Sequence, residues 1–161
     1  MTTLELQEEF QRRIEEHRKL LYKVCNAYCS DRASREDLAQ EILFQLWRSY
    51  KRFDGRCQFS TWMYRIALNV AISFYRREGH RTREALPEEQ PLPEPADPEE
   101  IRLLYEFIAE LDPFSKALIL LYLEGNTYKE IADITGITET NVATKISRLK
   151  NKGRERWTSM R

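Results

Sequence analysis

Residues 127–150 read "TYKEIADITGITETNVATKISRLK", and this stretch decides the fold of the C-terminal part of the chain. Thr127 and Glu130 have the spacing of a capping box, so a short helix is expected to begin just after Thr127. Gly136 is a candidate left-handed C-cap, and Thr138 is the expected cap of a second helix. Two capped helices around one glycine form a helix-turn-helix pattern.

The second of these helices has two different faces. With Val142 pointing inward, Ile146 and Leu149 lie within about 40 degrees of it at 100 degrees per residue, and they form the expected core seam. Small polar groups and cations suit a DNA major groove, where central side chains read base edges and marginal cations hold phosphates. The alternatives are a merely solvated face and a helix-turn-helix that binds only proteins. The residues expected to bind DNA are Thr140, Thr144, Lys145, Ser147, Arg148, Asn151 and Lys152.

The charges of the chain are segregated along the sequence. The 161 residues carry no formal net charge. Residues 138–161 nevertheless hold 7 basic and 2 acidic side chains, whereas residues 84–100 hold 7 acidic and no basic ones. A localised cationic surface is typical of proteins that bind polyanions, even when the total charge is zero.

A proline-rich acidic segment separates two parts of the chain. Five of the six prolines lie between residues 87 and 98, and residues 79–98 show no apolar period. Proline removes backbone donors and like charges repel, so we expect a flexible, extended linker there. The predicted fold is therefore all-α, with two small helical domains at residues 1–78 and 99–161.

Apolar residues recur at helical spacing throughout both predicted domains. Ser34 is the expected N-cap of the second helix, and Ser60 with Thr61 the expected cap of the third. The expected helices cover residues 4–29, 34–53, 60–77, 101–111, 113–124 and 127–135, with a last helix from residue 138.

The cysteines and the missing motifs limit the possible chemistry. Three cysteines cannot all pair, and the N-terminus carries no secretory apolar run, so reduced thiols in a cytoplasmic protein are expected. Cys25, Cys29 and His17 could be imagined as metal ligands, but a fourth ligand is missing and helix-packing thiols are the favoured interpretation. No stretch reaches the roughly 20 apolar residues of a membrane span. No catalytic or phosphate-binding motif is present, so we expect a non-enzymatic protein without metal or cofactor.

Three stretches, in order, resemble the two-domain extracytoplasmic-function (ECF) sigma factors of the sigma-70 superfamily. "EDLAQEILFQLWRSYKRF" is similar to the polymerase-binding helix of sigma region 2, and "FSTWMYRIALNVAISFYRR" to the helix that melts and reads the minus-ten element. "LDPFSKALILLYLEGNTYKEIADITGITETNVATKISRLKNK" resembles region 4, which reads the minus-thirty-five element. The resemblance runs from about Phe10 to Trp157.

The resemblance implies a surface for core RNA polymerase on the segment 34–53. Docking on the beta-prime coiled coil is implied for Asp37, Gln40, Glu41, Phe44 and Trp47. The residues support this surface because the segment has more large apolar side chains than one core seam needs. Core packing remains an equal alternative for Trp47, and a solvated face is the alternative for Gln40 and Glu41.

The resemblance also implies that the loop "GRCQFS" and the following helix hold the minus-ten element. An aromatic ring such as that of Phe59 can stack on an unpaired base, while arginines lie near phosphates. Trp62 is expected in the core beneath. The implied minus-ten residues are Arg56, Phe59, Ser60, Arg65, Asn69, Ser73, Arg76 and Arg77.

Two positions depart from the family pattern, and several partners follow from it. Thr138 stands where proline usually opens the recognition helix, and Ala143 stands where a basic residue is common, which leaves the promoter contacts open. The implied partners are core RNA polymerase through its beta-prime coiled coil and beta flap, promoter DNA and an anti-sigma factor, with a monomeric free protein. The expected function is promoter-specific transcription initiation. A helix-turn-helix regulator that acts without polymerase and a protein-binding helical adaptor are the alternatives.

Overall fold

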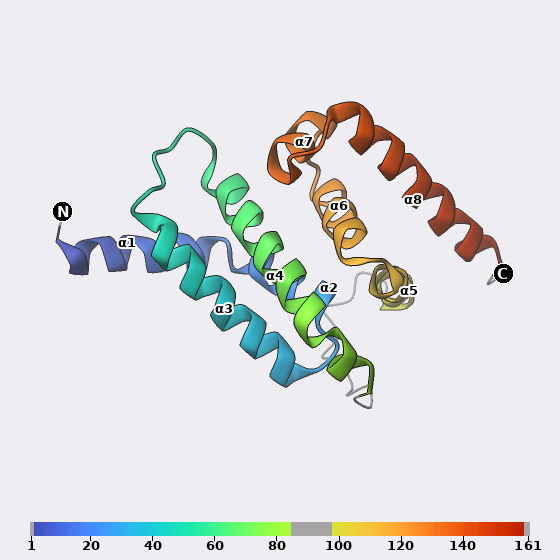
Figure 1. Ribbon diagram of the computed structural model, residues 1–161, viewed down its shortest axis with the longest axis horizontal. Helices are drawn as coiled ribbons and strands as arrows, with labels where there is room; N and C mark the ends of the chain where they lie inside the picture. The colour runs from blue at the N-terminus through green and yellow to red at the C-terminus, as the bar shows by residue number, and fades with distance from the viewer. Residues whose placement is uncertain (1, 85–97, 160–161) are drawn as a thin grey trace. The chain divides into compact units, whose positions relative to one another are not determined.

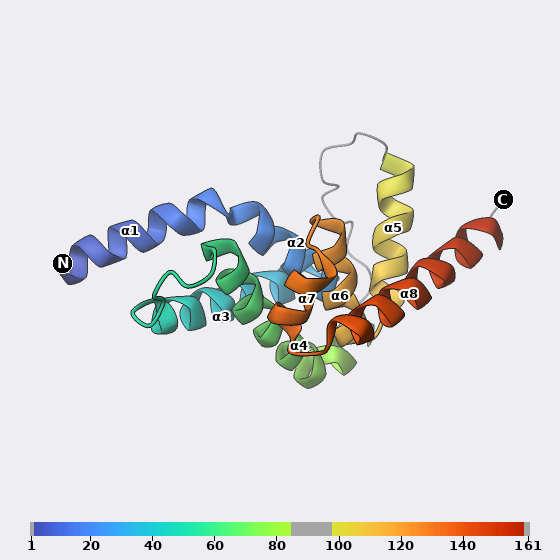
Figure 2. The same cartoon turned by 90° about the horizontal axis from the view of Figure 1, so that it is seen from above.

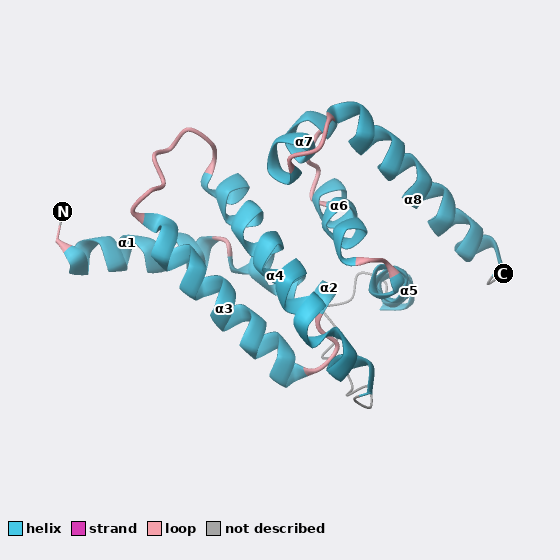
Figure 3. Cartoon of the chain, viewed as in Figure 1, coloured by secondary structure: helices cyan, strands magenta, loops and turns pink. Residues whose placement is uncertain are grey.

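A computed structural model of the chain describes residues 2–84 and 98–159. These residues form eight α-helices and no strand (Figure 3), which confirms the all-α prediction. The helices are α1 (Thr3–Glu16), α2 (Arg18–Tyr28), α3 (Arg32–Tyr50), α4 (Phe59–Glu84), α5 (Pro98–Glu110), α6 (Pro113–Leu123), α7 (Tyr128–Thr135) and α8 (Glu139–Ser159).

The chain divides into two compact units, residues 1–90 and 91–161. The division falls inside the segment 79–98, where we expected the linker. That prediction was wrong for residues 79–84, because α4 continues to Glu84. The first proline of the segment is Pro87, so nothing before it removes a helical backbone donor. Residues 85–97 of the expected linker lie outside the described residues.

Unit 1 is built from α1 to α4. Helices α3 and α4 run antiparallel side by side (Figure 1), joined by the loop 51–58. The apolar period of α3 faces inward, and its buried residues recur every fourth position at Leu38, Ile42 and Leu46. Side chains with no exposed surface form the core of this unit: Val24, Leu38, Ile42, Leu46, Met63, Ala67 and Ala71.

The single helix expected over residues 4–29 is two helices with a break at His17. The backbone N–H of His17 donates to the carbonyl of Ile14 (3.0 Å), one residue short of the α-helical partner. The ring Nδ1 of His17 donates instead to the carbonyl of Arg13 (2.9 Å), the acceptor that a continuous helix would have used. The chain therefore changes direction between α1 and α2 (Figure 2).

The caps of α3 and α4 also differ from the prediction. Asp31, not Ser34, is the N-cap of α3, and its carboxylate accepts from the backbone N–H of Ser34 at 2.9 Å. Partial burial opposes ionisation of Asp31, but the hydrogen bonds from Ser34 outweigh it and lower the pKa of the carboxyl group. Helix α3 ends at Tyr50 rather than Phe53, and α4 begins at Phe59, ahead of the expected caps.

The three cysteines differ in accessibility. Cys25 and Cys29 are buried in unit 1 as helix-packing thiols, whereas Cys57 is half-buried in the loop 51–58. Burial raises the pKa of Cys25 to about 12, and the nearby charge of Arg35 offsets only part of that effect. Within the described residues, no group of three or more His, Cys, Asp or Glu side chains could hold a metal ion.

We expect iodoacetamide at pH 8 to modify Cys57 and to spare Cys25 and Cys29, because the thiolate is the reactive form and only Cys57 is accessible. Mass spectrometry of peptides after a short pulse gives the three rates. In urea, all three thiols should react at similar rates. Equal rates for Cys25 and Cys57 in the folded chain would contradict the burial described above.

Unit 2 is built from α5 to α8. The predicted starts of α6, α7 and α8 are confirmed, whereas α5 begins at Pro98, three residues before the expected helix. Asp112 caps α6, with Pro113 in the first turn, and its carboxylate accepts from the N–H of Ser115 at 3.1 Å. Helix α8 approaches α5 closely at Gly153, where a Cβ atom would stand 3.5 Å from the ring of Phe107. The core of the unit contains Ile108, Leu118, Leu121, Ile131, Val142 and Ile146, each at most 1% exposed.

Candidate nucleic-acid interfaces

Helices α7 and α8 form the helix-turn-helix that the sequence predicted. Thr127 and Glu130 make the capping box, with bonds of 3.1 and 2.9 Å between each side chain and the other residue's backbone N–H. Gly136 ends α7 with φ = 82°, a left-handed conformation that favours glycine. The hydroxyl of Thr138 accepts from the N–H of Asn141 at 3.1 Å and so caps α8. These local bonds fix the turn between the two helices.

The two faces of α8 are also confirmed. Val142 and Ile146 are fully buried and Leu149 is 7% exposed, so the predicted seam packs into unit 2. The opposite face is solvated along four turns of the helix. The exposed residues on it are Thr140, Thr144, Ser147, Arg148, Asn151 and Lys152.

Two of the lysines at the margins of this face, Lys145 and Lys150, lie against aromatic rings of α6. Lys145 is half-buried, with its Nζ atom 6.0 Å from the ring centre of Phe114. Lys150 has its Nζ atom 4.4 Å from the ring centre of Tyr122, and a hydrogen bond with Tyr122 raises the pKa of the lysine. The cationic edges of α8 are therefore supported by aromatic rings of the helix behind it.

A second polar stripe runs along α4 in unit 1. Arg65, Asn69, Ser73 and Arg76 are all exposed, and their spacing of three to four residues places them on one side of the helix. The stripe offers two cations, an amide and a hydroxyl to a ligand. Its composition matches what a single-stranded nucleic acid needs along its backbone.

The loop 51–58 and the start of α4 surround an aromatic cluster. The half-buried ring of Phe59 lies 5.3 Å from Trp62, 5.8 Å from Phe53 and 6.4 Å from Tyr50, measured between ring centres. Phe59 is thus partly covered by neighbours, and Trp62 belongs to the same cluster. Of the other residues expected here, Ser60 is half-buried, and exposed Arg56 is paired with Asp54 at 2.9 Å.

The surface expected to bind polymerase is a hollow of about 640 Å³ between α3 and α4. Phe44 stands at it with 61% of its surface exposed, an unusual position for a large apolar side chain. Trp47 lies apart from the hollow, 5.2 Å from the ring of Phe10 in α1, so it packs within unit 1. The lining residues are Asp37, Gln40, Glu41, Phe44, Phe74, Arg77 and Glu78.

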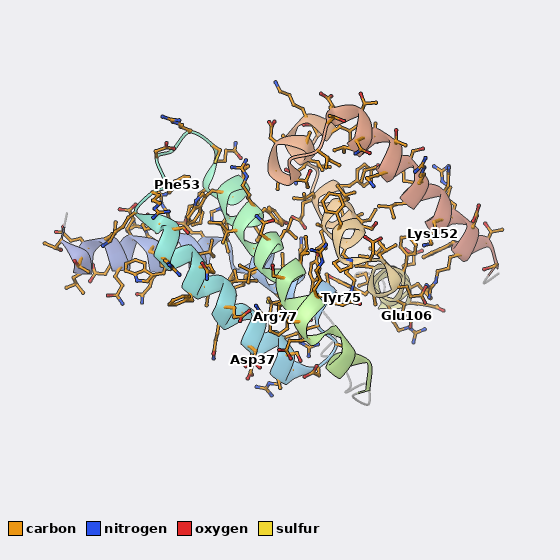
Figure 4. All side chains as sticks on the ribbon, viewed as in Figure 1. Asp37, Phe53, Tyr75, Arg77, Glu106 and Lys152 are labelled. Carbon is orange, nitrogen blue, oxygen red and sulfur yellow. The ribbon has the colours of Figure 1, made fainter. Side chains whose placement is uncertain are left out.

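An ion pair joins the two predicted surfaces of unit 1, and sequence reasoning missed it. One guanidinium nitrogen of Arg77 donates to both carboxylate oxygens of Glu41, each at 2.9 Å. Figure 4 shows Arg77 on α4 close to Asp37 on the neighbouring α3. Arg77, expected on the minus-ten surface, therefore lies in the hollow expected for polymerase.

The geometry first defines a class: a helical protein of two units, the second of which carries a helix-turn-helix with an exposed polar face. Comparison with family models then gives the particular family. The sigma-70 region 2 model matches residues 13–81, and the sigma-70 region 4 model matches residues 101–152. The chain belongs to the sigma-70 family, as an ECF sigma factor.

Individual relatives agree with the family models. The chain is 29% identical to ECF RNA polymerase sigma factor SigE of Mycolicibacterium smegmatis, covering 88% of this chain and 59% of that protein. It is 26% identical to ECF RNA polymerase sigma factor SigX of Bacillus subtilis, covering 86% of this chain and 78% of that one. The chain thus spans less than two thirds of SigE and more than two thirds of SigX.

Solved structures share the fold. The sigma factor RpoE in complex with the anti-sigma factor NepR from Bartonella quintana has a TM-score of 0.77 at 19% identity, covering 96% of this chain and 99% of that one. CnrH in complex with the cytosolic domain of CnrY has a TM-score of 0.68 at 21% identity, with 95% and 90% covered. In the described part of the chain, no helix has the length and apolar content needed to cross a membrane.

Proposed function

We propose that the chain binds core RNA polymerase, recognises a two-part promoter and opens it for initiation. The observation that carries this proposal is the order of two family regions, each of which coincides with an exposed polar face. Region 2 contains the hollow and the stripe on α4, and region 4 contains the helix-turn-helix. The chain supplies specificity, while polymerase performs the chemistry.

We place the main polymerase contact at the hollow between α3 and α4, where α3 contributes the exposed residues Asp37, Gln40 and Phe44. Aromatic side chains are enriched in protein interfaces, and a carboxylate beside the ring repels phosphates, so the hollow suits a protein partner better than a nucleic acid. A groove of about 440 Å³ between α5, α6 and α8 is a second candidate, for the beta flap. It is largely apolar, with exposed Leu123 and Trp157 in its lining.

An anti-sigma factor is the third proposed partner. Support comes from the two structures with a similar fold: one is a complex with the anti-sigma factor NepR, and the other is a complex with the cytosolic domain of CnrY. A regulator of this kind would have to cover one of the surfaces described above to prevent polymerase binding. The hollow at Phe44 is the surface with the most exposed large aromatic ring.

Run-off transcription with purified core polymerase and a genomic library tests the proposal. We expect new transcripts whose start sites share two upstream elements, and we expect none of them from core polymerase alone. A polymerase-independent regulator would instead bind DNA by itself and direct no transcript. Specific binding without any promoter-directed transcript would overturn the proposal in favour of that alternative.

Replacing Arg148 by alanine should weaken binding to the minus-thirty-five element by about 1 to 3 kcal/mol and relax the preference at one base, because an exposed arginine can bond two atoms of guanine. Lys152→Ala is the matched control, since a lysine at the edge is expected to hold a phosphate. It should weaken binding to all sequences alike and reduce the salt slope by about one ion.

Fluorescence anisotropy on matched and scrambled upstream elements over a salt series separates the two effects. An unchanged ratio of matched to scrambled affinity in Arg148→Ala would show that another face of α8 meets the bases.

A further inference from the structure

Arg13 in α1 faces three aromatic rings, and only one of them, that of Phe59, belongs to a predicted surface. Its guanidinium carbon lies 5.4 Å from the ring centre of Phe59, 5.6 Å from that of Phe53 and 5.9 Å from that of Tyr50. Guanidinium groups are attracted to aromatic faces at such distances. One cation from the N-terminal helix thus contacts three rings from other parts of unit 1.

A short network holds this guanidinium in place. The carboxylate of Glu9, one turn earlier in α1, lies 3.6 Å from a terminal nitrogen of Arg13. The hydroxyl of Tyr50 donates to the same carboxylate at 2.5 Å. Because Glu9 contacts both the arginine and the tyrosine, the end of α3 and the cation of α1 are fixed to each other.

The three rings belong to the two ends of one loop. Tyr50 is the last residue of α3, Phe53 lies where the loop 51–58 leaves that helix (Figure 4), and Phe59 is the first residue of α4. Hydrogen bonds such as Phe53 N–H to Tyr50 O (3.0 Å) and Arg56 N–H to Asp54 Oδ1 (3.1 Å) shape the loop over two or three residues. Across the whole loop, Phe59 contacts Phe53 and Tyr50 directly, at 5.8 and 6.4 Å between ring centres, and Arg13 adds one cation that contacts all three rings.

We infer that Arg13 is a positioning residue for reading the minus-ten element. By contacting Tyr50, Phe53 and Phe59 together, it reinforces the ring contacts that set the separation of the two loop ends. The loop then presents Arg56 and its neighbours in one conformation to an unpaired base, which is the condition for discriminating between bases. This inference rests on the proposed function, because it assigns Arg13 a role within promoter opening.

The test uses the full chain assembled with core polymerase, on a promoter found by run-off mapping. Four versions of the non-template strand vary the base that faces the loop, and 2-aminopurine in the minus-ten element reports opening. Arg13→Met keeps an unbranched apolar stem and removes the cation, while Arg13→Lys keeps the cation without the planar stack. Arg12→Met is the matched control, because Arg12 is the exposed neighbour on the same helix.

We expect Arg13→Met to reduce the preference among the four bases by about threefold to tenfold, and Arg13→Lys to restore part of it. Arg12→Met should match the wild-type chain. The base preference is the ratio of promoter opening between two versions of the strand, measured with the same protein preparation. An unfolded fraction lowers both values equally and does not change their ratio. A second readout in the free protein is the alkylation rate of Cys57 in the loop, which should rise in Arg13→Met relative to Arg12→Met.

Two outcomes separate the inference from the function on which it rests. A wild-type holoenzyme that opens the promoter, together with an unchanged base preference in Arg13→Met, would overturn the positioning role alone. Equal losses of base preference in Arg12→Met and Arg13→Met would also overturn it, because the loss would then come from removing a positive charge from α1 and not from removing the ring contacts of Arg13. A wild-type chain that directs no transcript would overturn both.

Discussion

Replacing Phe44 by alanine should weaken binding of the chain to core RNA polymerase about thirtyfold or more, because truncating a hot-spot residue at the centre of an interface costs about 2 kcal/mol or more. Phe44 is 61% exposed, so its loss should leave the fold of unit 1 intact. Competition against a labelled wild-type chain for core polymerase measures the change. Asp37→Lys at the same hollow should add to the loss by reversing a charge.

Tyr22→Ala is the matched control for Phe44→Ala. Tyr22 is another exposed aromatic residue of unit 1, at 45% exposure, and it does not line the hollow. Its truncation should leave polymerase affinity unchanged, and thermal melting should show that both variants fold. If Tyr22→Ala weakened binding as much as Phe44→Ala, the polymerase surface would have to be placed elsewhere on unit 1.

Ile146→Ala should lower the stability of unit 2 by about 2 to 5 kcal/mol, the range for truncating a fully buried isoleucine. Ile146 lies in the middle of the seam by which α8 packs against the rest of unit 2. Hydrogen exchange of α8 peptides over a urea series measures the local free energy of opening. Binding to the minus-thirty-five element should fall in parallel, because the polar face depends on this packing.

Ser147→Ala, one position further on the same helix, is the control. Ser147 is exposed, so its replacement should change the stability of unit 2 by no more than about 0.5 kcal/mol. A loss below about 1 kcal/mol in Ile146→Ala would mean that the site can collapse around the missing atoms, and that the seam contributes less than its burial indicates.

The parts of the fold that follow from local chemistry could be predicted from the sequence. The capping box of Thr127 and Glu130, the left-handed Gly136 and the cap at Thr138 each depend on residues three or fewer positions apart. Such patterns need no knowledge of the rest of the chain. The buried and exposed faces of α8 followed for the same reason, since helical periodicity alone decides them.

The parts that depend on a choice between local alternatives, or on packing between distant residues, could not be predicted. At the break, the ring Nδ1 of His17 donates a hydrogen bond to the carbonyl of Arg13. The amphipathic pattern of the sequence continues through this position, so it does not indicate the break. The cap of α3 was misplaced because Asp31 and Ser34 are both good caps, and the sequence does not decide between them. The bond from Arg77 to Glu41 joins residues 36 positions apart and needs the antiparallel pairing of α3 with α4.

The candidate site was predictable in its location and less so in its details. The resemblance implied that Arg65, Asn69 and Ser73 belong to an exposed face, and the structure leaves all three exposed on one side of α4. The sequence could not show that Phe59 already contacts other rings, or that Arg77 already has an acidic partner. Both features arise from tertiary contacts, which also decide how much of each side chain is left for a ligand.

The aromatic supports behind Lys145 and Lys150 affect the thermodynamics of association. A lysine side chain that becomes ordered on binding loses up to about 2 kcal/mol of rotamer freedom. Phe114 and Tyr122 contact these two side chains in the free protein, so under the proposed DNA-binding role part of that loss occurs during folding. Under that role, the entropy of DNA binding at the margins of α8 is less unfavourable than it would be for two freely rotating lysines, because these two side chains are already partly ordered in the free protein.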